Sequence, residues 1–256
     1  MNALSGLTEN AAVQKDDDRL GGGGFEPLNS DVYDFTIEHA YVTKSSGGAT
    51  AVNFSFLGAD NAKLRTTIYV SSGTAKGCKN TYEKKNKDGV METHYLPGFN
   101  QVNSLCWMTA GKALADLAST VDGTKVINLY DYDKKAEVPT QVDMIMGLIN
   151  MKITAAVLKQ TVDKKKKNDT GEYMPTGETR DENEIDKFFR TSDKLTFAEI
   201  TKGVTEPIFM VAWLEKWKDK IKSKVSKTGI VTGTPGAPGQ PAQPATATPL
   251  FANQAQ

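Results

Sequence analysis

Cysteine and histidine are scarce in this sequence, and their scarcity argues against several kinds of site. The 256 residues include two cysteines, Cys78 and Cys106, and two histidines, His39 and His94. No CxxC pair occurs, and no spacing of these four residues suits a structural zinc site. We therefore expect a reduced, cytosolic protein without disulfides, metal or other cofactor, in which both cysteines serve packing.

The signatures of common catalytic sites are also missing. The glycine run Gly21–Gly24 lacks the Gly-Lys-Ser/Thr continuation of a phosphate-binding loop, and neither HExxH nor GxSxG occurs. Asp131 and Asp133 stand two apart on a predicted strand, so both would face one way and could hold Mg2+. Such carboxylates are more often simply exposed to solvent. We therefore expect no enzyme, with a metal-dependent nuclease using Asp131 and Asp133 as a weaker alternative.

Neither a long apolar run nor a net charge is present. The longest candidate, Met144–Val157, is interrupted by Gly147, Asn150 and Lys152, which indicates buried protein and not a membrane span. The first residues lack a positive segment followed by an apolar core, so we expect no secretory signal. Lys plus Arg (31) equals Asp plus Glu (31), which excludes a uniformly basic binder but allows positive charge to gather on one side.

Composition changes sharply at both ends of the chain. Residues 1–24 end in an acidic cluster and a glycine run, a composition that can bury little, so we expect a flexible N-terminal arm. Residues 228–256 are rich in Pro, Gly, Ala, Thr and Gln, which predicts a disordered tail. Its one apolar point, Leu250 with Phe251, is a candidate contact for a partner protein. The folded domain is expected over residues 25–227.

Alternating apolar and polar residues predict a meander of strands joined by short turns. The three predicted strands are Val32–Val42, Ala51–Gly58 and Leu64–Val70. Strict alternation would place these residues on one face of the first strand: Tyr33, Phe35, Ile37, His39 and Tyr41. In the second strand Phe54 and Phe56 share the apolar face, so we expect both in the core.

The remainder of the ordered chain mixes helices with further strands. Ser71–Pro97 shows no clean periodicity and is polar and lysine-rich, with an Asp-Gly turn at Asp88. Apolar residues at helical spacing predict a helix over Asn100–Ser119, with Trp107 packed. Thr196 begins a capping box, and Pro207 begins a C-terminal helix. The apolar stripe of that helix is Met210, Trp213, Leu214, Trp217 and Ile221. Other predicted elements are a strand over Lys125–Asp133, a helix or turn over Val142–Leu148, and strands over Met151–Val162 and Asn183–Arg190.

The order of these elements predicts the fold class. Three meandering strands, a helix and two strands joined by a long hairpin follow the order of a five-stranded oligonucleotide-binding (OB) barrel, here with additional strands and a C-terminal helix, in the α+β class. Such barrels bind their ligand across the second and third strands and between the hairpin loops. Those parts would be Val52–Val70, Lys44–Ala49 and Asp163–Glu182.

Cations and aromatic rings are interleaved in these segments, as single-stranded nucleic acid requires, because cations follow its phosphates and rings stack on its bases. The candidate nucleic-acid-binding residues are Lys63, Arg65, Tyr69, Lys79, Tyr82, Lys84, Lys85, Lys87, Tyr95, Lys164, Lys165, Lys166, Lys167 and Tyr173. A lysine run is more often a solvated surface than a binding site. The acidic segment 178–186 could also neutralise the lysines at Lys164–Lys167.

Three longer segments add a family resemblance. "YLPGFNQVNSLCWMTAGK", "LYDYDKKAEVPTQV" and "GEYMPTGETRDENEIDKFF" resemble bacteriophage-encoded single-stranded DNA-binding proteins of the OB-fold type, over residues 25–224. The resemblance implies a non-enzymatic protein of the host cytoplasm that coats single-stranded DNA during phage replication, recombination and repair. A strand-annealing recombination protein is the alternative. Many such proteins end in an acidic tail that docks partners. Here the tail is neutral, so a phage or host replication or transcription protein would have to contact Leu250 and Phe251 instead.

Overall fold

The computed structural model describes residues 26–59, 62–119, 123–131, 134–168 and 173–226. The predicted N-terminal arm, the tail with Leu250 and Phe251, and Asp133 lie outside these residues. The chain divides into two units. The main unit contains the described residues up to Val162 together with Asp181–Lys224, and the arm unit contains the described residues of 163–180 together with Val225 and Ser226.

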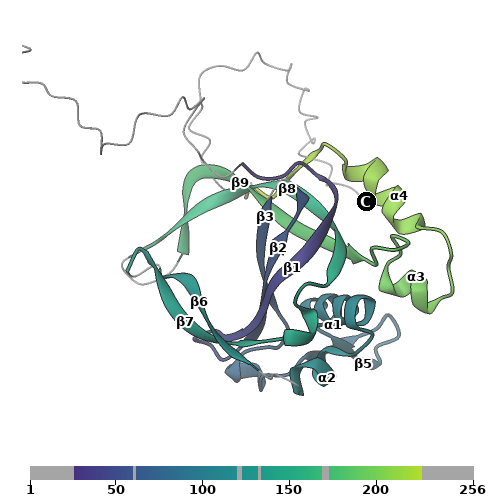
Figure 1. Cartoon of the computed structure of the whole chain (residues 1–256), viewed down its shortest axis with the longest axis horizontal. Helices are drawn as coiled ribbons and strands as arrows, with labels where there is room; N and C mark the ends of the chain where they lie inside the picture. The colour runs from purple at the N-terminus through teal and green to yellow at the C-terminus, as the bar shows by residue number, and fades with distance from the viewer. Residues whose placement is uncertain (1–25, 60–61, 120–122, 132–133, 169–172, 227–256) are drawn as a thin grey trace, which may run out of the picture. The chain divides into compact units, whose positions relative to one another are not determined.

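A mainly antiparallel sheet forms the centre of the main unit (Figure 1). The predicted meander is present as β1 (Asp31–Lys44), β2 (Thr50–Leu57) and β3 (Lys63–Tyr69). The strand β8 (Lys152–Lys167) pairs with the first half of β1, β9 (Tyr173–Phe189) pairs with β8, and β10 (Ile221–Ser223) runs parallel to β8. The pairings run from β10 through β8, β1 and β2 to β3, and they do not close the sheet into the expected barrel, because no described strand pairs with the far edge of β3.

Two further hairpins occur in the chain, and the apolar periodicity of the sequence predicted neither of them completely. β4 (Thr81–Lys85) and β5 (Met91–Tyr95) form a separate two-stranded sheet within the segment expected to be irregular. Almost all of their side chains are exposed on both faces, so no apolar alternation marks them. The turn at Asp88 is confirmed, with Gly89 at φ 80°. The second hairpin joins β6 (Thr124–Asp131) to β7 (Ala136–Met144). The helix or turn expected over Val142–Leu148 is present only in part, because β7 runs to Met144 and a 3-10 turn covers Met146–Leu148.

The helices follow the predicted positions with two changes. The single helix expected over Asn100–Ser119 is two, α1 (Pro97–Ala110) and α2 (Leu114–Ser119), because Gly111 ends α1 in the left-handed conformation. Two short 3-10 turns are η2 (Thr74–Lys76) and η3 (Met146–Leu148). α3 (Phe197–Thr201) has the predicted capping box, and α4 (Ile208–Trp217) ends before Ile221, which lies exposed in β10. No helix in the described part of the chain is long and apolar enough to span a membrane.

A β-bulge in β1 changes which residues face the core. Ile37 pairs with Phe56 and His39 with Ser55, so Glu38 is an extra residue on β1. Before the bulge Phe35 and Ile37 are buried, as alternation predicts. After it the buried position falls on Ala40. The prediction that His39 and Tyr41 share the core face was therefore wrong, because one inserted residue reverses the alternation.

The core is built from rings of the meander and from α1. Phe54 and Phe56 are buried as predicted, with ring centroids 5.3 Å apart. Phe56 also lies 5.9 Å from Phe188 of β9. Cys106 is buried against this cluster, and burial raises the pKa of its thiol to about 12. Cys78 is exposed, so the expectation that both cysteines serve packing holds for Cys106 alone.

A smaller cluster attaches α4 to the sheet. Ala156, Leu158 and Phe189 pack against Trp213, and the indole N–H of Trp213 donates to Asp186 at 2.7 Å. The apolar stripe predicted for the C-terminal helix is confirmed at Trp213. Trp107, expected to be packed, is 42% exposed on α1, with its ring 6.3 Å from that of Phe197.

Replacing Phe56 by alanine should lower the free energy of unfolding of the main unit by about 3–5 kcal/mol. Phe56 is fully buried between the rings of Phe35, Phe54 and Phe188, so the substitution removes contacts on every side. Urea denaturation followed by tryptophan fluorescence measures the change. The matched control, Val126→Ala on the exposed strand β6, should stay within about 0.5 kcal/mol of the parent. Equal losses from the two variants would contradict this account of the core.

Candidate nucleic-acid interface

The outer face of the meander presents polar side chains in rows that cross the strands. The pairing register places His39, Ser55 and Arg65 in one row and Tyr41, Asn53 and Thr67 in the next. Because side chains alternate along a strand, these residues all point away from the apolar core. The rows exist only because the bulge at Glu38 turns His39 and Tyr41 outward.

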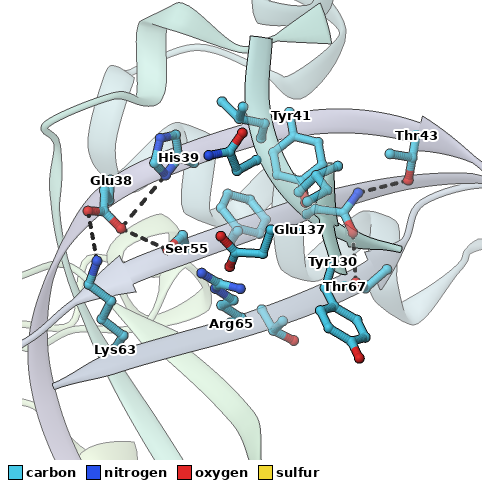
Figure 2. A pocket seen from close by; sticks show the side chains of 16 residues that line it. Glu38, His39, Tyr41, Thr43, Ser55, Lys63, Arg65, Thr67, Tyr130 and Glu137 are labelled. Carbon is cyan, nitrogen blue, oxygen red and sulfur yellow. Dashed lines mark hydrogen bonds and ion pairs between the residues drawn. The ribbon is translucent and has the colours of Figure 1, made fainter. Parts of the chain in front are cut away.

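These rows form the floor of a groove of about 730 Å³, which we call the sheet groove (Figure 2). The β6–β7 hairpin supplies its other wall through residues 127–130 and Glu137. β7 is held next to β1 by the pairs Tyr41 with Met144 and Val42 with Asp143. The sheet groove is therefore open, polar on its floor and bordered by the rings of Tyr41 and Tyr130.

Hydrogen bonds fix the polar floor. The Asn53 side-chain amide donates to Thr43 Oγ1 at 2.8 Å, and Thr67 Oγ1 donates to the Asn53 carbonyl oxygen at 2.7 Å (Figure 2). The three side chains come from β1, β2 and β3, so they tie the strands together across the floor. A ligand would meet a surface whose amide and hydroxyl groups are already oriented.

Glu38 organises the charges at one end of the sheet groove. Its carboxylate lies 3.4 Å from Lys63 Nζ and 3.7 Å from His39 Nδ1, and it accepts a hydrogen bond from Ser55 Oγ at 3.0 Å (Figure 2). Partial burial by itself would raise the pKa of Glu38, but the Ser55 hydrogen bond and the charge of Lys63 outweigh it, so the pKa lies below its ordinary value. Lys63 is thus partly neutralised where it stands.

Arg65 is the less constrained cation of the groove. It is exposed on β3, and no carboxylate of the described chain lies within ion-pair distance of it. Its positive charge acts on Tyr41, but burial is the larger effect and raises the pKa of the Tyr41 hydroxyl. Glu137 lines the same groove. The two acids Glu38 and Glu137 therefore balance the two permanent cations Lys63 and Arg65 in this groove. Binding of an anion would depend on the positions of the individual charges more than on a net positive potential.

A second cavity gathers three of the other predicted residues. It measures about 780 Å³ and lies between the end of β3, the segment Ser71–Lys79 and the β4–β5 hairpin; we call it the hairpin pocket. Tyr69, Tyr82 and Lys79 all line it, and so does Lys76, which the sequence interpretation did not select as a site residue. Tyr69 is 53% exposed and Tyr82 41% exposed, so both rings are accessible.

The other predicted residues of the hairpin are exposed but do not line this pocket. They are Lys84, Lys85, Lys87 and Tyr95. The Tyr95 ring stacks on Phe99 of α1 with centroids 4.8 Å apart. One face of the Tyr95 ring is therefore occupied by the protein. The Tyr82 ring has a looser contact, with the His94 ring tilted against it at 5.8 Å, and it lines the pocket, which makes Tyr82 the better candidate for stacking on a base.

The lysine run Lys164–Lys167 and Tyr173 belong to the arm unit. The run was expected to be a loop, but it continues β8 as an extended strand to Lys167, and Tyr173 begins β9. Extension places Lys164 and Lys166 on one side and Lys165 and Lys167 on the other. Lys164 Nζ forms an ion pair with Glu178 at 3.0 Å, which confirms the expected neutralisation for this one lysine. All four lysines and Tyr173 are exposed.

Several groove residues escaped sequence reasoning. His39, Tyr41, Asn53 and Tyr130 line the sheet groove but carried no binding signal in the sequence. His39 and Tyr41 were assigned to the core by simple alternation. Tyr130 lies on β6, whose role as the opposite wall depends on tertiary structure. Only the alternation of Asn53 with its apolar neighbours Val52 and Phe54 could have marked it as facing outward.

The carboxylates considered for a nuclease gain no support. Asp133 and the side chain of Asp131 lie outside what the structure describes. Among the described residues, no three His, Cys, Asp or Glu side chains are grouped so as to hold a metal ion. Comparison with protein-family models and with curated proteins finds no match to this chain.

Changing Glu38 to glutamine should weaken the acid dependence of stability. Because the pKa of Glu38 is lower in the folded state, its contribution is present above the pKa of an unfolded glutamate, about 4.3, and disappears as pH falls through the lower folded value. Between about pH 4.5 and pH 3 the parent should therefore lose more stability than Glu38→Gln. Urea unfolding midpoints at stepped pH measure the difference.

Glu137→Gln serves as the control for this prediction, because Glu137 lines the same groove and no described cation lies within ion-pair distance of it. Its pH profile should follow that of the parent. If Glu38→Gln also follows the parent profile, the proposed charge cluster makes no contribution in solution.

Proposed function

We propose that this protein binds single-stranded DNA without sequence preference through the sheet groove, on a core of the OB type. The observation that carries the proposal is the composition of that groove. Arg65, Lys63, Tyr41 and Tyr130 border a floor of amide and hydroxyl groups on one open face of three strands. The cations suit contacts with the phosphates of a single strand, and the rings suit stacking on its bases.

The order and pairing of the strands support an OB-related core. A three-stranded meander is followed by α1, and then by β8 and β9, of which β8 pairs with the first strand. OB barrels have this order, are partly open, and bind across their second and third strands. The missing pairing between β3 and β9 is compatible with such an open form, because a gap of about 490 Å³ lies between Lys63–Arg65 and Glu182–Asn183.

The chemistry of the groove favours binding without sequence readout. Every base offers a face to an aromatic ring, and each stacked ring contributes on the order of 1–3 kcal/mol. Lys63 and Arg65 supply charge that does not depend on the base. Since Glu38 and Glu137 offset this charge, we expect moderate affinity from the sheet groove alone. Lys165, Lys166 and Lys167 of the arm unit are separate, exposed candidates for phosphate contacts.

The resemblance to phage single-stranded DNA-binding proteins suggests the setting. In this proposal the protein is phage-encoded, acts in the host cytoplasm, and protects exposed strands during replication, recombination and repair. Leu250 and Phe251 would contact a phage or host replication or transcription protein in place of an acidic tail.

Changing Arg65 to alanine should weaken the binding of oligo(dT) about tenfold, the equivalent of one hydrogen bond to a charged group of about 1.5 kcal/mol. The slope of log K against log salt concentration should become shallower by about 0.7, because one phosphate contact is lost. Quenching of intrinsic fluorescence at several salt concentrations measures both values. The control Lys112→Ala removes an exposed cation outside both grooves and should change neither value. An Arg65→Ala variant with parental affinity and slope would overturn the role of the sheet groove.

Changing Lys165, Lys166 and Lys167 together to alanine should weaken binding equally for all base compositions and reduce the salt slope by up to about 2, at about 0.7 per phosphate contact. Adding Lys164→Ala should have a smaller effect, because Glu178 already pairs with Lys164. Salt titrations with oligo(dT) and oligo(dC) test this. A triple control with Lys112, Lys202 and Lys216 changed to alanine removes the same charge elsewhere. If both triple variants give the same slope, the lysine run makes no specific contact.

A further inference from the structure

The hairpin pocket is held in shape by close backbone contacts at glycines. A Cβ atom on Gly98 would lie 2.1 Å from the carbonyl oxygen of Tyr69, and one on Gly73 would lie 2.6 Å from that of Gly47. Distances this short are not seen for real Cβ atoms. Only glycine therefore lets α1 approach the end of β3, and the segment at Gly73 approach the β1–β2 turn, this closely. Both contacts place lining segments of the pocket directly against one another.

Further backbone bonds secure the segment that carries the pocket's lysines. The amide of Ser72 donates to the carbonyl of Lys79 at 2.7 Å, and the amide of Lys79 donates to Ser72 Oγ at 2.9 Å. The amide of Thr74 donates to the carbonyl of Gly47 at 2.8 Å, which anchors this segment to the β1–β2 turn. These hydrogen bonds therefore hold in place the backbone segment that carries Lys76 and Lys79, both of which line the pocket.

The groups that line the pocket suit a nucleotide. Tyr69 and Tyr82 provide accessible rings, and Lys76 and Lys79 provide two cations. Glu83 is the one acidic residue among those that line it. Positive charge next to exposed rings, with less opposing acid than in the sheet groove, matches a base with its attached phosphate.

The hairpin pocket continues the line of the sheet groove along β3. Lys63, Arg65, Thr67 and Tyr69 alternate outward on this strand, and the first three line the sheet groove while Tyr69 lines the pocket. The cross-strand register gives the same order, with the row ending in Tyr69 following the rows of Arg65 and Thr67. Arg65 and Tyr69 are four residues apart, or about 13 Å at about 3.3 Å per residue.

We infer that the hairpin pocket is a second nucleotide subsite, which takes a base and its phosphate from the same strand after that strand leaves the sheet groove. This inference depends on the proposed function, because it extends the path of one bound single strand. The separation of about 13 Å equals the rise of about four stacked nucleotides at 3.4 Å each. Oligonucleotides too short to reach both sites occupy the sheet groove alone, and longer ones gain affinity by filling the pocket.

The test compares oligo(dT) of increasing length, from about 4 to about 16 nucleotides, the range of site sizes known for OB folds. For the parent, affinity should rise steeply once both sites are spanned. Tyr82→Ala should leave the affinity for the shortest oligonucleotides unchanged and weaken that for the longest by roughly five- to a hundredfold. Tyr82→Phe keeps the ring and should restore the rise. Lys79→Ala should flatten the salt slope with long oligonucleotides only.

Two controls separate this inference from the proposed function. Trp107→Ala removes a ring of nearly the same exposure as Tyr82, outside both grooves, and should leave the length dependence unchanged. Arg65→Ala should weaken short and long oligonucleotides alike. If the parent binds no oligo(dT), the proposed function fails. If the parent and Arg65→Ala behave as expected but Tyr82→Ala keeps the full rise with length, the pocket is not part of the strand's path and the inference alone is overturned.

Discussion

The β-bulge at Glu38 is the constraint on which the candidate interface depends. β1 pairs with β8 over Asp31–Thr36 and with β2 from Thr36 to Lys44, so it belongs to both halves of the sheet. The inserted residue keeps Ile37 and Ala40 in the core while His39 turns outward. Without it, the second half of β1 would direct Tyr41 into the core, and the sheet groove would lose the row that joins Tyr41 to Asn53 and Thr67.

Local charge balance distinguishes the two cavities of the main unit. In the sheet groove, Glu38 holds Lys63 and is itself kept ionised by Ser55 and Lys63. Such a network orients side chains, but it reduces the field that a phosphate would experience. The hairpin pocket has two lysines against one acid. In the proposed complex with single-stranded DNA, position and ring stacking would therefore dominate in the first cavity, and charge would contribute more in the second.

Glycine makes the close contact between α1 and β3 possible. Tyr69 ends β3, and its carbonyl faces Gly98 in the first turn of α1 at a distance that no side chain would allow. The helix consequently packs directly on the strand that carries Lys63, Arg65 and Thr67. α1 thus packs through Val102 and Leu105 on the core side of the sheet whose other side carries the outward row of β3.

Local residue patterns predicted much of the frame: the meander, the burial of Phe54 and Phe56, the capping box at Thr196, and a mainly β chain with few helices. These features depend on neighbours in the sequence, where alternation and capping act. The bulge, the β4–β5 and β6–β7 hairpins and the outward position of Tyr41 depended on the tertiary structure. A register shift is decided by the partner strand, and an exposed hairpin has no apolar pattern to reveal it. Composition and the predicted order of elements selected Lys63, Arg65, Tyr69 and Tyr82. Only long-range pairing could place the first two in one groove and the last two around another.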